Sequence, residues 1–240
     1  MPPPPPGPAV QPTGTPDEQG LKSDANQDHA WYLPTAETVP GGSFVFTDWE
    51  LLLAGVKYGA TNNLELSAET LVPITTDIPF LLLLGAKLRV VKTDNLRVAV
   101  NANVLYTSAS GDHFTMGEVG AAASLCLDSA CHSLLTGGMQ IMFGINTTNS
   151  SGAFVFVPTA SFIGRLGRHV KALIEVDSAG YHANGDTQLA RGALVMYGLR
   201  FYSREIAADI GFARPLCSDG CSTGSLLLGV PLVTFSYRFE

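Results

Sequence analysis

The end of the chain, Ser225–Glu240, reads SLLLGVPLVTFSYRFE and decides the fold. Its side chains alternate between two faces. The face that holds Phe235, Tyr237 and Phe239 is apolar, whereas the opposite face becomes polar and ends in Arg238. Because successive side chains of a β-strand point to opposite faces of a sheet, this period of two predicts a strand. Aromatic residues on one face of a terminal strand are typical of a membrane barrel, which turns apolar residues toward lipid.

The composition of the 240 residues supports a membrane protein without membrane helices. Apolar residues make up 46% and charged residues 15% of the chain, against roughly 25% charged residues in soluble domains. No stretch contains the about 20 consecutive apolar residues of a membrane helix. The net charge of −7 comes without a basic patch, so a nucleic-acid partner is excluded. We find no phosphate loop and no dinucleotide fingerprint, and we expect no cofactor.

The chain repeats one unit, in which two alternating runs are joined by a short turn and followed by a longer polar loop. Twelve strands are predicted at 42–48, 49–60, 63–73, 79–91, 95–107, 113–127, 132–146, 153–164, 168–180, 190–202, 205–215 and 226–239. The first pair could also form one long strand. Short turns at one end and longer loops at the other predict an all-β, transmembrane, antiparallel up-and-down barrel of about 12 strands.

The two faces of these strands differ in charge. One face is free of charges, and we expect it to contact lipid. The other face is predicted to line the lumen and carries Lys57, Glu65, Glu69, Lys87, Arg89, Arg97, Asn101, Asn103, Arg165, Lys171, Glu175, Asp177, Arg200, Asp209 and Arg238. A soluble lipocalin-like barrel, with the apolar face inside, is the alternative. Aromatic residues near strand ends and the unequal loop lengths favour the membrane barrel.

Two segments resemble a known class of protein. The terminal strand resembles the C-terminal strand of bacterial outer-membrane β-barrels, whose terminal aromatic residue is read by the assembly machinery. Gly55–Leu66 (GVKYGATNNLEL) is similar to a hairpin of small, uncharacterised, porin-like barrels, with an aromatic–glycine pair, a polar turn and an alternating strand. The resemblance implies a bacterial outer-membrane location, a lipid bilayer around the barrel, and the barrel assembly machinery as a partner of the last strand.

Residues 1–30 are rich in Pro, Gly, Asp and Gln and have almost no apolar content. Such a segment buries too little surface to offset its ordering entropy, so we predict a disordered Pro-rich periplasmic linker before a barrel of residues 31–240. This tail is interpreted as a spacer or as a ligand of a periplasmic partner. The first residues carry no secretory signal, so we expect that a leader was removed and Met1 added, or that the start is misassigned.

The four cysteines form two close pairs, and both are disulfide candidates. Cys217 and Cys221 lie in a Ser-, Asp- and Gly-rich loop, where a disulfide is the favoured interpretation. For Cys126 and Cys131, a disulfide and two buried free thiols remain equal alternatives. The predicted topology places the two pairs at opposite ends of the barrel, so we expect no metal site, because zinc needs about four converging ligands.

The lumen charges admit two functions. Buried charges are usually paired, and Arg200 and Asp209 are expected to pair across the turn at 203–205. The charges could close the barrel as a structural or assembly protein, or form a constriction that selects solutes. We predict a narrow porin-like channel for small solutes, with the closed structural barrel as the alternative.

Catalysis has little support in the sequence. His113 beside Asp112, with Ser108 and Ser110 nearby, is the only suggestive cluster, and no histidine sits in a motif with a serine nucleophile. We therefore expect that the protein is not an enzyme, with a surface hydrolase as the third alternative.

Overall fold

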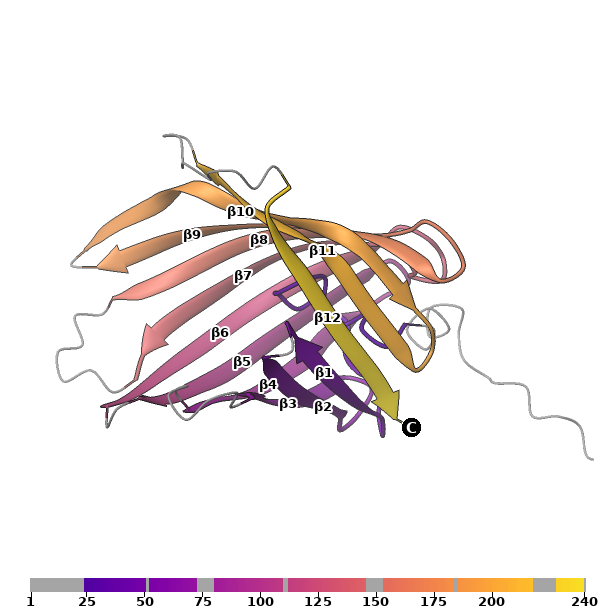
Figure 1. Ribbon diagram of the computed structural model, residues 1–240, viewed down its shortest axis with the longest axis horizontal. Helices are drawn as coiled ribbons and strands as arrows, with labels where there is room; N and C mark the ends of the chain where they lie inside the picture. Colours follow the sequence, from indigo (N-terminus) through magenta and orange to yellow (C-terminus); the bar gives the residue numbers. More distant parts are fainter. Residues whose placement is uncertain are drawn as a thin grey trace, which may run out of the picture.

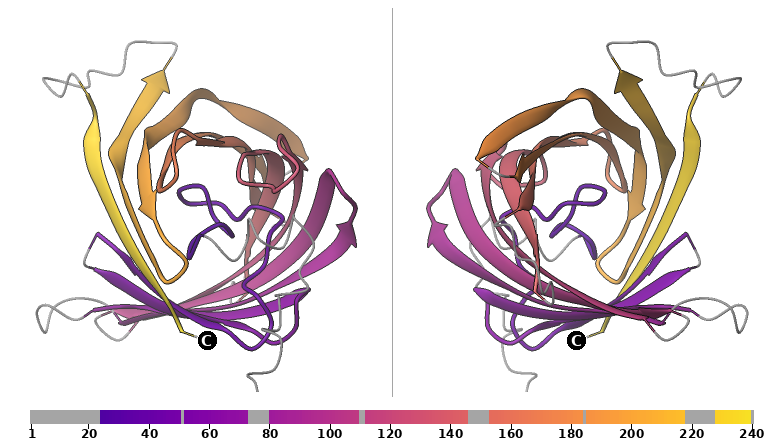
Figure 2. Two further views of the ribbon diagram at one scale, coloured as in Figure 1. Left: turned by 90° about the vertical axis from the view of Figure 1, so that its right-hand side faces the viewer. Right: turned by 90° about the vertical axis from the view of Figure 1, so that its left-hand side faces the viewer.

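The computed structural model describes residues 24–50, 52–72, 80–109, 112–145, 153–183, 185–217 and 228–239. These residues form twelve antiparallel strands in a closed barrel (Figures 1 and 2). The strands are β1 (Phe44–Trp49), β2 (Leu53–Gly59), β3 (Leu64–Leu71), β4 (Phe80–Lys92), β5 (Leu96–Ala109), β6 (Asp112–Cys126), β7 (Leu134–Gly144), β8 (Phe154–Arg165), β9 (Val170–Ala183), β10 (Asp186–Tyr202), β11 (Ile206–Cys217) and β12 (Val230–Phe239). The described residues include no helix that is both long and apolar enough to cross a membrane.

Each strand pairs with its neighbours in the chain, and β1 pairs with β12 to close the ring. The seam runs from Phe44 opposite Phe239 to Trp49 opposite Thr234. The predicted all-β, antiparallel, up-and-down barrel of about twelve strands is confirmed. The first pair, for which the sequence left one strand or two open, is two strands, and the chain leaves β1 through Glu50 with a φ of 57°.

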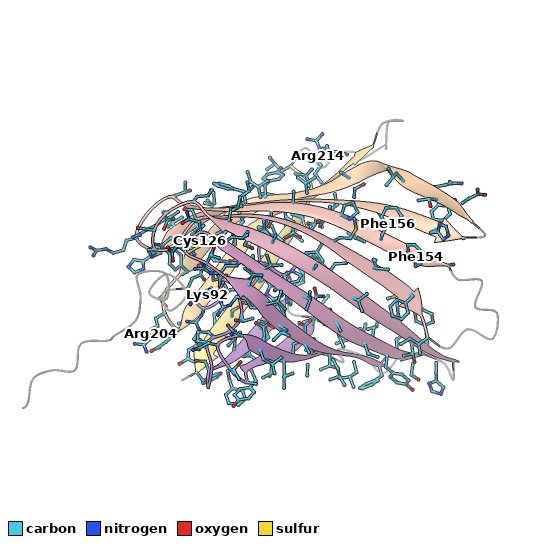
Figure 3. The ribbon with its side chains drawn as sticks, turned by 180° about the vertical axis from the view of Figure 1, so that it is seen from behind. Lys92, Cys126, Phe154, Phe156, Arg204 and Arg214 are labelled. Carbon is cyan, nitrogen blue, oxygen red and sulfur yellow. A yellow bond between two sulfur atoms is a disulfide. The ribbon has the colours of Figure 1, made fainter. Side chains whose placement is uncertain are left out.

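The connections β2–β3, β4–β5, β6–β7, β8–β9 and β10–β11 lie at one end of the barrel, here named the short-turn end. Side-chain oxygens hold several of these turns. The Thr61 hydroxyl accepts hydrogen bonds from the backbone N–H groups of Asn63 and Leu64, and Thr93 accepts one from Leu96. Hydroxyls that accept from nearby backbone groups are a standard turn device. Figure 3 shows Lys92, Cys126 and Arg204 at this end; the opposite end is the long-loop end.

The outside of the barrel is apolar around its circumference. Side chains of the face predicted to contact lipid are exposed there, among them Phe46, Val56, Leu66, Leu84, Val100, Val119, Met139, Ile174, Leu199, Ile210 and Val233. Arg97 and Glu175, from the other face, are fully buried inside. A closed barrel with apolar side chains outside and ionisable side chains inside has the arrangement of an outer-membrane barrel. The alternative of a soluble lipocalin-like barrel is therefore wrong.

A segment before the first strand fills part of the barrel. Residues 24–43, here named the plug, lie inside the ring of strands, where Figure 2 shows them as the indigo loops. The sequence interpretation placed residues 24–30 in a disordered linker, whereas the structure buries them, with Asp24 and Ala30 both at 0% exposure. Composition alone misses this because the polar side chains find their partners on distant strands. Residues 1–23 lie outside the described residues, and there the linker stays a prediction.

Candidate functional site: a plugged lumen below a cavity

The plug has an aromatic anchor. Trp31 is fully buried, and its ring lies against Gly198 of β10 and Gly211 of β11, which are opposite one another in the sheet. A Cβ added to Gly198 or Gly211 would stand 2.8 or 2.6 Å from the Cζ2 atom of this ring. The apolar residues that complete the cluster are Ala30, Cys126, Cys131, Leu134, Ile163, Leu173 and Met196. The missing glycine side chains therefore make the seat for the indole.

The tip of the plug is held by one carboxylate. Glu175 of β9 accepts hydrogen bonds from three successive backbone N–H groups, those of Trp31 (2.9 Å), Tyr32 (3.0 Å) and Leu33 (3.2 Å). Glu175 thus fixes the orientation of the tip.

Each acidic side chain of the plug pairs with a basic side chain of the barrel. Lys171 lies 2.6 Å from Asp24, Lys57 2.8 Å from Asp28, and Arg89 2.9 Å from Glu37. A second arginine, Arg97, lies 3.5 Å from Glu37. Because an unpaired buried charge is costly, the plug supplies the counter-charges that the lumen needs.

These charges shift the titration of the plug acids. Burial raises the pKa of Asp24, but the charges of Lys171 and Arg200 outweigh burial and lower this pKa to about 2. Burial also raises the pKa of Asp28, while His29 and Lys57 bring it well below its usual value. Asp24 and Asp28 are therefore ionised when the plug is docked.

Arg200 joins the barrel wall to the plug. Its guanidinium donates two hydrogen bonds to Asp209, at 2.7 and 2.8 Å, so the pair expected across the β10–β11 turn is present. The remaining donors reach the plug carbonyls of Asn26 (2.5 Å), His29 (3.1 Å) and Ala30 (3.0 Å). Arg200, Asp209, Asn26 and Ala30 are buried, so removing the plug would leave several strong donors without partners.

The residues expected to line the lumen are distributed as follows. Eleven are buried inside the barrel: Lys57, Glu65, Lys87, Arg89, Arg97, Asn101, Lys171, Glu175, Arg200, Asp209 and Arg238. Glu69, Asn103 and Asp177 face the lumen and are half-buried. Arg165 is different and corrects the expectation: it is exposed at the short-turn end and donates to the carbonyl of Gly167 at 3.1 Å.

Sequence reasoning missed the inner partners of these residues. Asp24, Asp28 and Glu37 precede the first strand, and the strand pattern gave no reason to place them in the lumen. Lumen bases outnumber lumen acids among the buried predicted residues, and an acid-rich segment stands just before the barrel. That imbalance was the available signal.

Cys126 and Cys131 form a disulfide bond with an S–S distance of 1.98 Å in the β6–β7 turn. This settles the alternatives left open for the pair, and it excludes buried free thiols there. The bond also stands beside the plug, because the Gln27 side-chain amide donates to the carbonyl of Cys131. Glu37 lies near both sulfurs, but sulfurs in a disulfide are not the thiolates that bind metals. The other candidate, Cys217 with Cys221, lies outside the described residues.

A cavity of about 540 Å³ lies between the plug and the long-loop end. Its floor is the plug tip, with Tyr32, Leu33 and Pro34. Its apolar walls are Leu53, Leu71, Leu81, Leu83, Leu105, Met116 and Met142. Its polar side carries Lys57, Glu65, Ser67, Glu69, Lys87, Asn101, Asn103 and Glu118.

The acidic part of the cavity wall is built by several strands. Glu118 of β6 accepts hydrogen bonds from Asn103 (2.8 Å) and Asn101 (3.4 Å) of β5. Glu69 of β3 crosses over Gly55, where an added Cβ would lie 2.7 Å from the Glu69 Cγ atom. Glu118 was not among the predicted lumen residues, although it falls on the inner face of its strand.

Comparisons with known proteins give a fold and no family. No protein-family model and no curated protein matches the chain. Among solved structures it is similar to OmpT of Vibrio cholerae (12% identity, TM-score 0.38, covering 78% of this chain and 64% of that one). It is also similar to LpxR from Salmonella typhimurium (9%, 0.42, 82% and 99%) and to OccAB3 from Acinetobacter baumannii (11%, 0.38, 90% and 59%). The chain thus spans less than two thirds of the length of OmpT and OccAB3.

One expectation needs correction at this point. The expectation that the chain is not an enzyme, drawn from its scattered histidines, is not supported, because the similar solved structures include LpxR, an outer-membrane enzyme. A barrel is a scaffold on which a local group of side chains can add chemistry. Of the suggested cluster, His113 bonds to the Tyr106 hydroxyl at 2.8 Å; Ser110 and the side chain of Asp112 lie outside the described residues.

Proposed function

We propose that this outer-membrane β-barrel is a narrow, porin-like channel for small solutes whose resting state is closed by its own plug. One observation carries the proposal: residues 24–43 occupy the lumen and are attached to it mainly by ion pairs and hydrogen bonds. The cavity on the long-loop side of the plug is then the entrance for the solute.

The chemistry of the docking surface supports a movable plug. An apolar contact exposed to water loses its stabilisation, whereas ionised side chains regain hydration when a plug leaves. The wall behind the plug carries Lys57, Arg89, Lys171 and Arg200, so an emptied lumen would be lined with charges and would fill with water. Charged side chains around a pore select ions by sign.

Single-channel recording in planar bilayers tests the proposal. The variant combines Asp24→Asn, Asp28→Asn and Glu37→Gln, which keep the shape of the plug and remove its charges; Glu205→Gln, exposed in the β10–β11 turn, is the matched control. We expect rare conductance steps for the wild type and the control, and frequent steps for the triple variant. Heat-modifiable migration on a gel verifies that each barrel is folded.

Trp31→Ala provides a second way to weaken the plug, without unpaired charges. If neither folded variant conducts more than the wild type, the barrel is a closed structural protein and the channel is ruled out. That second function is favoured by the same plug, because the resting lumen is filled.

We also propose two partners. The terminal strand β12, with its apolar face of Phe235 and Phe239 exposed, is recognised by the barrel assembly machinery. The residues that precede the plug reach a periplasmic partner. Deleting residues 1–23 would then abolish co-purification of that partner. If every co-purifying protein is retained, the proposal of a periplasmic partner is ruled out.

A further inference from the structure

We infer that the cavity binds an organic cation, namely an amine or quaternary ammonium group attached to an apolar body. The inference rests on the proposed function only in taking the cavity as the solute's entrance, and binding does not require transport. Three independent features carry it: the shape of the cavity, the charges that remain unneutralised in it, and a pair of aromatic rings.

The cavity has the size and the walls of a small-molecule site. Its volume of about 540 Å³ falls in the usual range of roughly 300–1,000 Å³, and such sites combine apolar walls with a few convergent polar groups. Leucine and methionine side chains from β2 to β7 form most of the wall. They would contact an alkyl or aryl body and exclude water from it.

The charges of the wall favour a cation. The two lysines of the cavity are already paired, Lys57 with Asp28 of the plug at 2.8 Å and Lys87 with Glu65 of the cavity wall at 3.3 Å. Glu69 and Glu118 add two further acidic side chains, and the charge of Glu69 acts on Glu118. Like charges in a partly dry site repel, and a ligand ammonium between them relieves the repulsion.

Hydrogen bonds fix the position of the Glu118 side chain in the cavity wall. Asn101 and Asn103 donate to Glu118, and Asn101 is in turn bonded to Gln140 at 3.0 Å. Gly85 leaves space on this wall that the side-chain oxygens of Asn103 and Ser67 occupy. The acidic side of the cavity is therefore a pre-organised polar surface.

Two aromatic rings stand at the same cavity. The rings of Tyr32, on the plug, and Trp49, on β1, lie 5.5 Å apart at an angle of 42°, and both line the cavity. Tyr32 is 64% exposed even though the rest of the plug is largely buried. The face of an aromatic ring attracts ammonium groups, and such rings recognise quaternary amines. A ligand there would touch both the barrel and the plug.

Isothermal titration calorimetry on the full-length protein in amphipol tests the inference, with octylammonium as the probe and octanoate as its matched anion of equal chain length. We expect saturable binding of octylammonium that is at least about tenfold tighter than that of octanoate. The double variant Glu69→Gln, Glu118→Gln should lose at least about tenfold in octylammonium affinity, while the control Glu205→Gln keeps it. Tyr32→Leu, which retains both carboxylates, should weaken octylammonium several-fold, by about threefold or more.

Equal or tighter binding of octanoate overturns the inference, as does an unchanged affinity in the folded double variant. If that variant does not fold, the Tyr32→Leu result and the octanoate comparison decide. The binding test and the conductance test are independent. If the plug variants conduct but the protein does not bind octylammonium, the channel proposal stands and the cation site is ruled out.

Discussion

Trp31 shows how one side chain connects the plug to the barrel. Its ring fills a seat made by two glycines on neighbouring strands and is fully buried. Replacing a buried tryptophan with alanine removes contacts and leaves a void, at a cost of about 3–5 kcal/mol. Trp31→Ala should therefore loosen the plug while the strand ladders remain.

Limited proteolysis of the folded protein checks this prediction. We expect cleavage within residues 24–43 to become faster in Trp31→Ala, with heat-modifiable migration preserved. Tyr32→Ala, at an exposed neighbouring position, is the control and should leave the cleavage rate nearly unchanged. Equal protection of both variants would show that the charges alone hold the plug.

His29 makes docking of the plug sensitive to pH. Burial lowers its pKa from 6.5 to about 4, and the positive charge of Lys57 acts in the same direction, against the negative charge of Asp28. The docked histidine is neutral, whereas a released one is protonated below about 6.5. Its contribution to docking is therefore complete above pH 6.5 and is lost as the pH falls toward 4.

Asp24 extends the same trend to lower pH. Its depressed pKa of about 2, against 3.8 when released, stabilises docking above pH 3.8, and this contribution is lost as the pH falls toward 2. We expect plug protection against proteolysis by an acid-tolerant protease to decline from pH 7 to pH 4 in the wild type. His29→Gln should flatten that first decline, and His113→Gln should not. Constant protection over this range would contradict the assignment.

At the scale of the element, the outer face of each strand has to remain free of charge. Ile210 on β11 is 53% exposed on the apolar exterior, and a lysine or arginine facing lipid at mid-depth costs about 2–4 kcal/mol. Ile210→Lys should lower the free energy of unfolding in liposomes by that amount. Urea titration measures it. Leu166→Lys, exposed in the β8–β9 turn, is the control and should change the stability little.

The disulfide stabilises the turn between β6 and β7. A bond between residues five apart in sequence lowers the conformational entropy of the unfolded chain. In the chain-entropy account, this stabilises the folded state by about 2 kcal/mol. Reduction, or the double variant Cys126→Ala, Cys131→Ala, should therefore increase hydrogen exchange in residues 127–133. Exchange in residues 24–30 should also rise, because Gln27 donates to the Cys131 carbonyl. Unchanged hydrogen exchange in residues 24–30 would show that the disulfide does not stabilise the plug.

The strands were predictable because their signal is local. Alternation along a few residues marks a strand whatever pairs with it, so the strands predicted at 190–202 and 226–239 appear close to those positions, as β10 and β12. The β1–β2 connection was harder to place, because Glu50 takes a left-handed backbone conformation that the alternation does not reveal. The inner face followed from charge, apart from Arg165 at the rim.

At the scale of the whole molecule, the plug could not be predicted in the same way. Asp24 meets a partner 147 residues away in Lys171, and Glu175 meets the backbone of Trp31 144 residues away. A polar segment without local periodicity has the composition of a linker, and only the closed barrel brings these groups together. The cavity was missed for the same reason, since its floor is the plug.

Removal of the plug should change the ion selectivity of the barrel. A chain without residues 24–43 loses the carboxylates that neutralise Lys57, Arg89 and Lys171, so its lumen gains a positive field. We expect this barrel to conduct and to prefer anions, as the reversal potential in a potassium chloride gradient would show. A cation preference would mean that the lumen acids, and not the plug, set the sign.

The pairing of plug acids with lumen bases also limits how the sequence can diverge. A homologous protein with a neutral residue in place of Lys171 would leave Asp24 buried without its ion-pair partner. We therefore expect these two positions to covary, and likewise Arg89 and Glu37. Related genes would then record the docked plug as correlated replacements between the first forty codons and the distant strands.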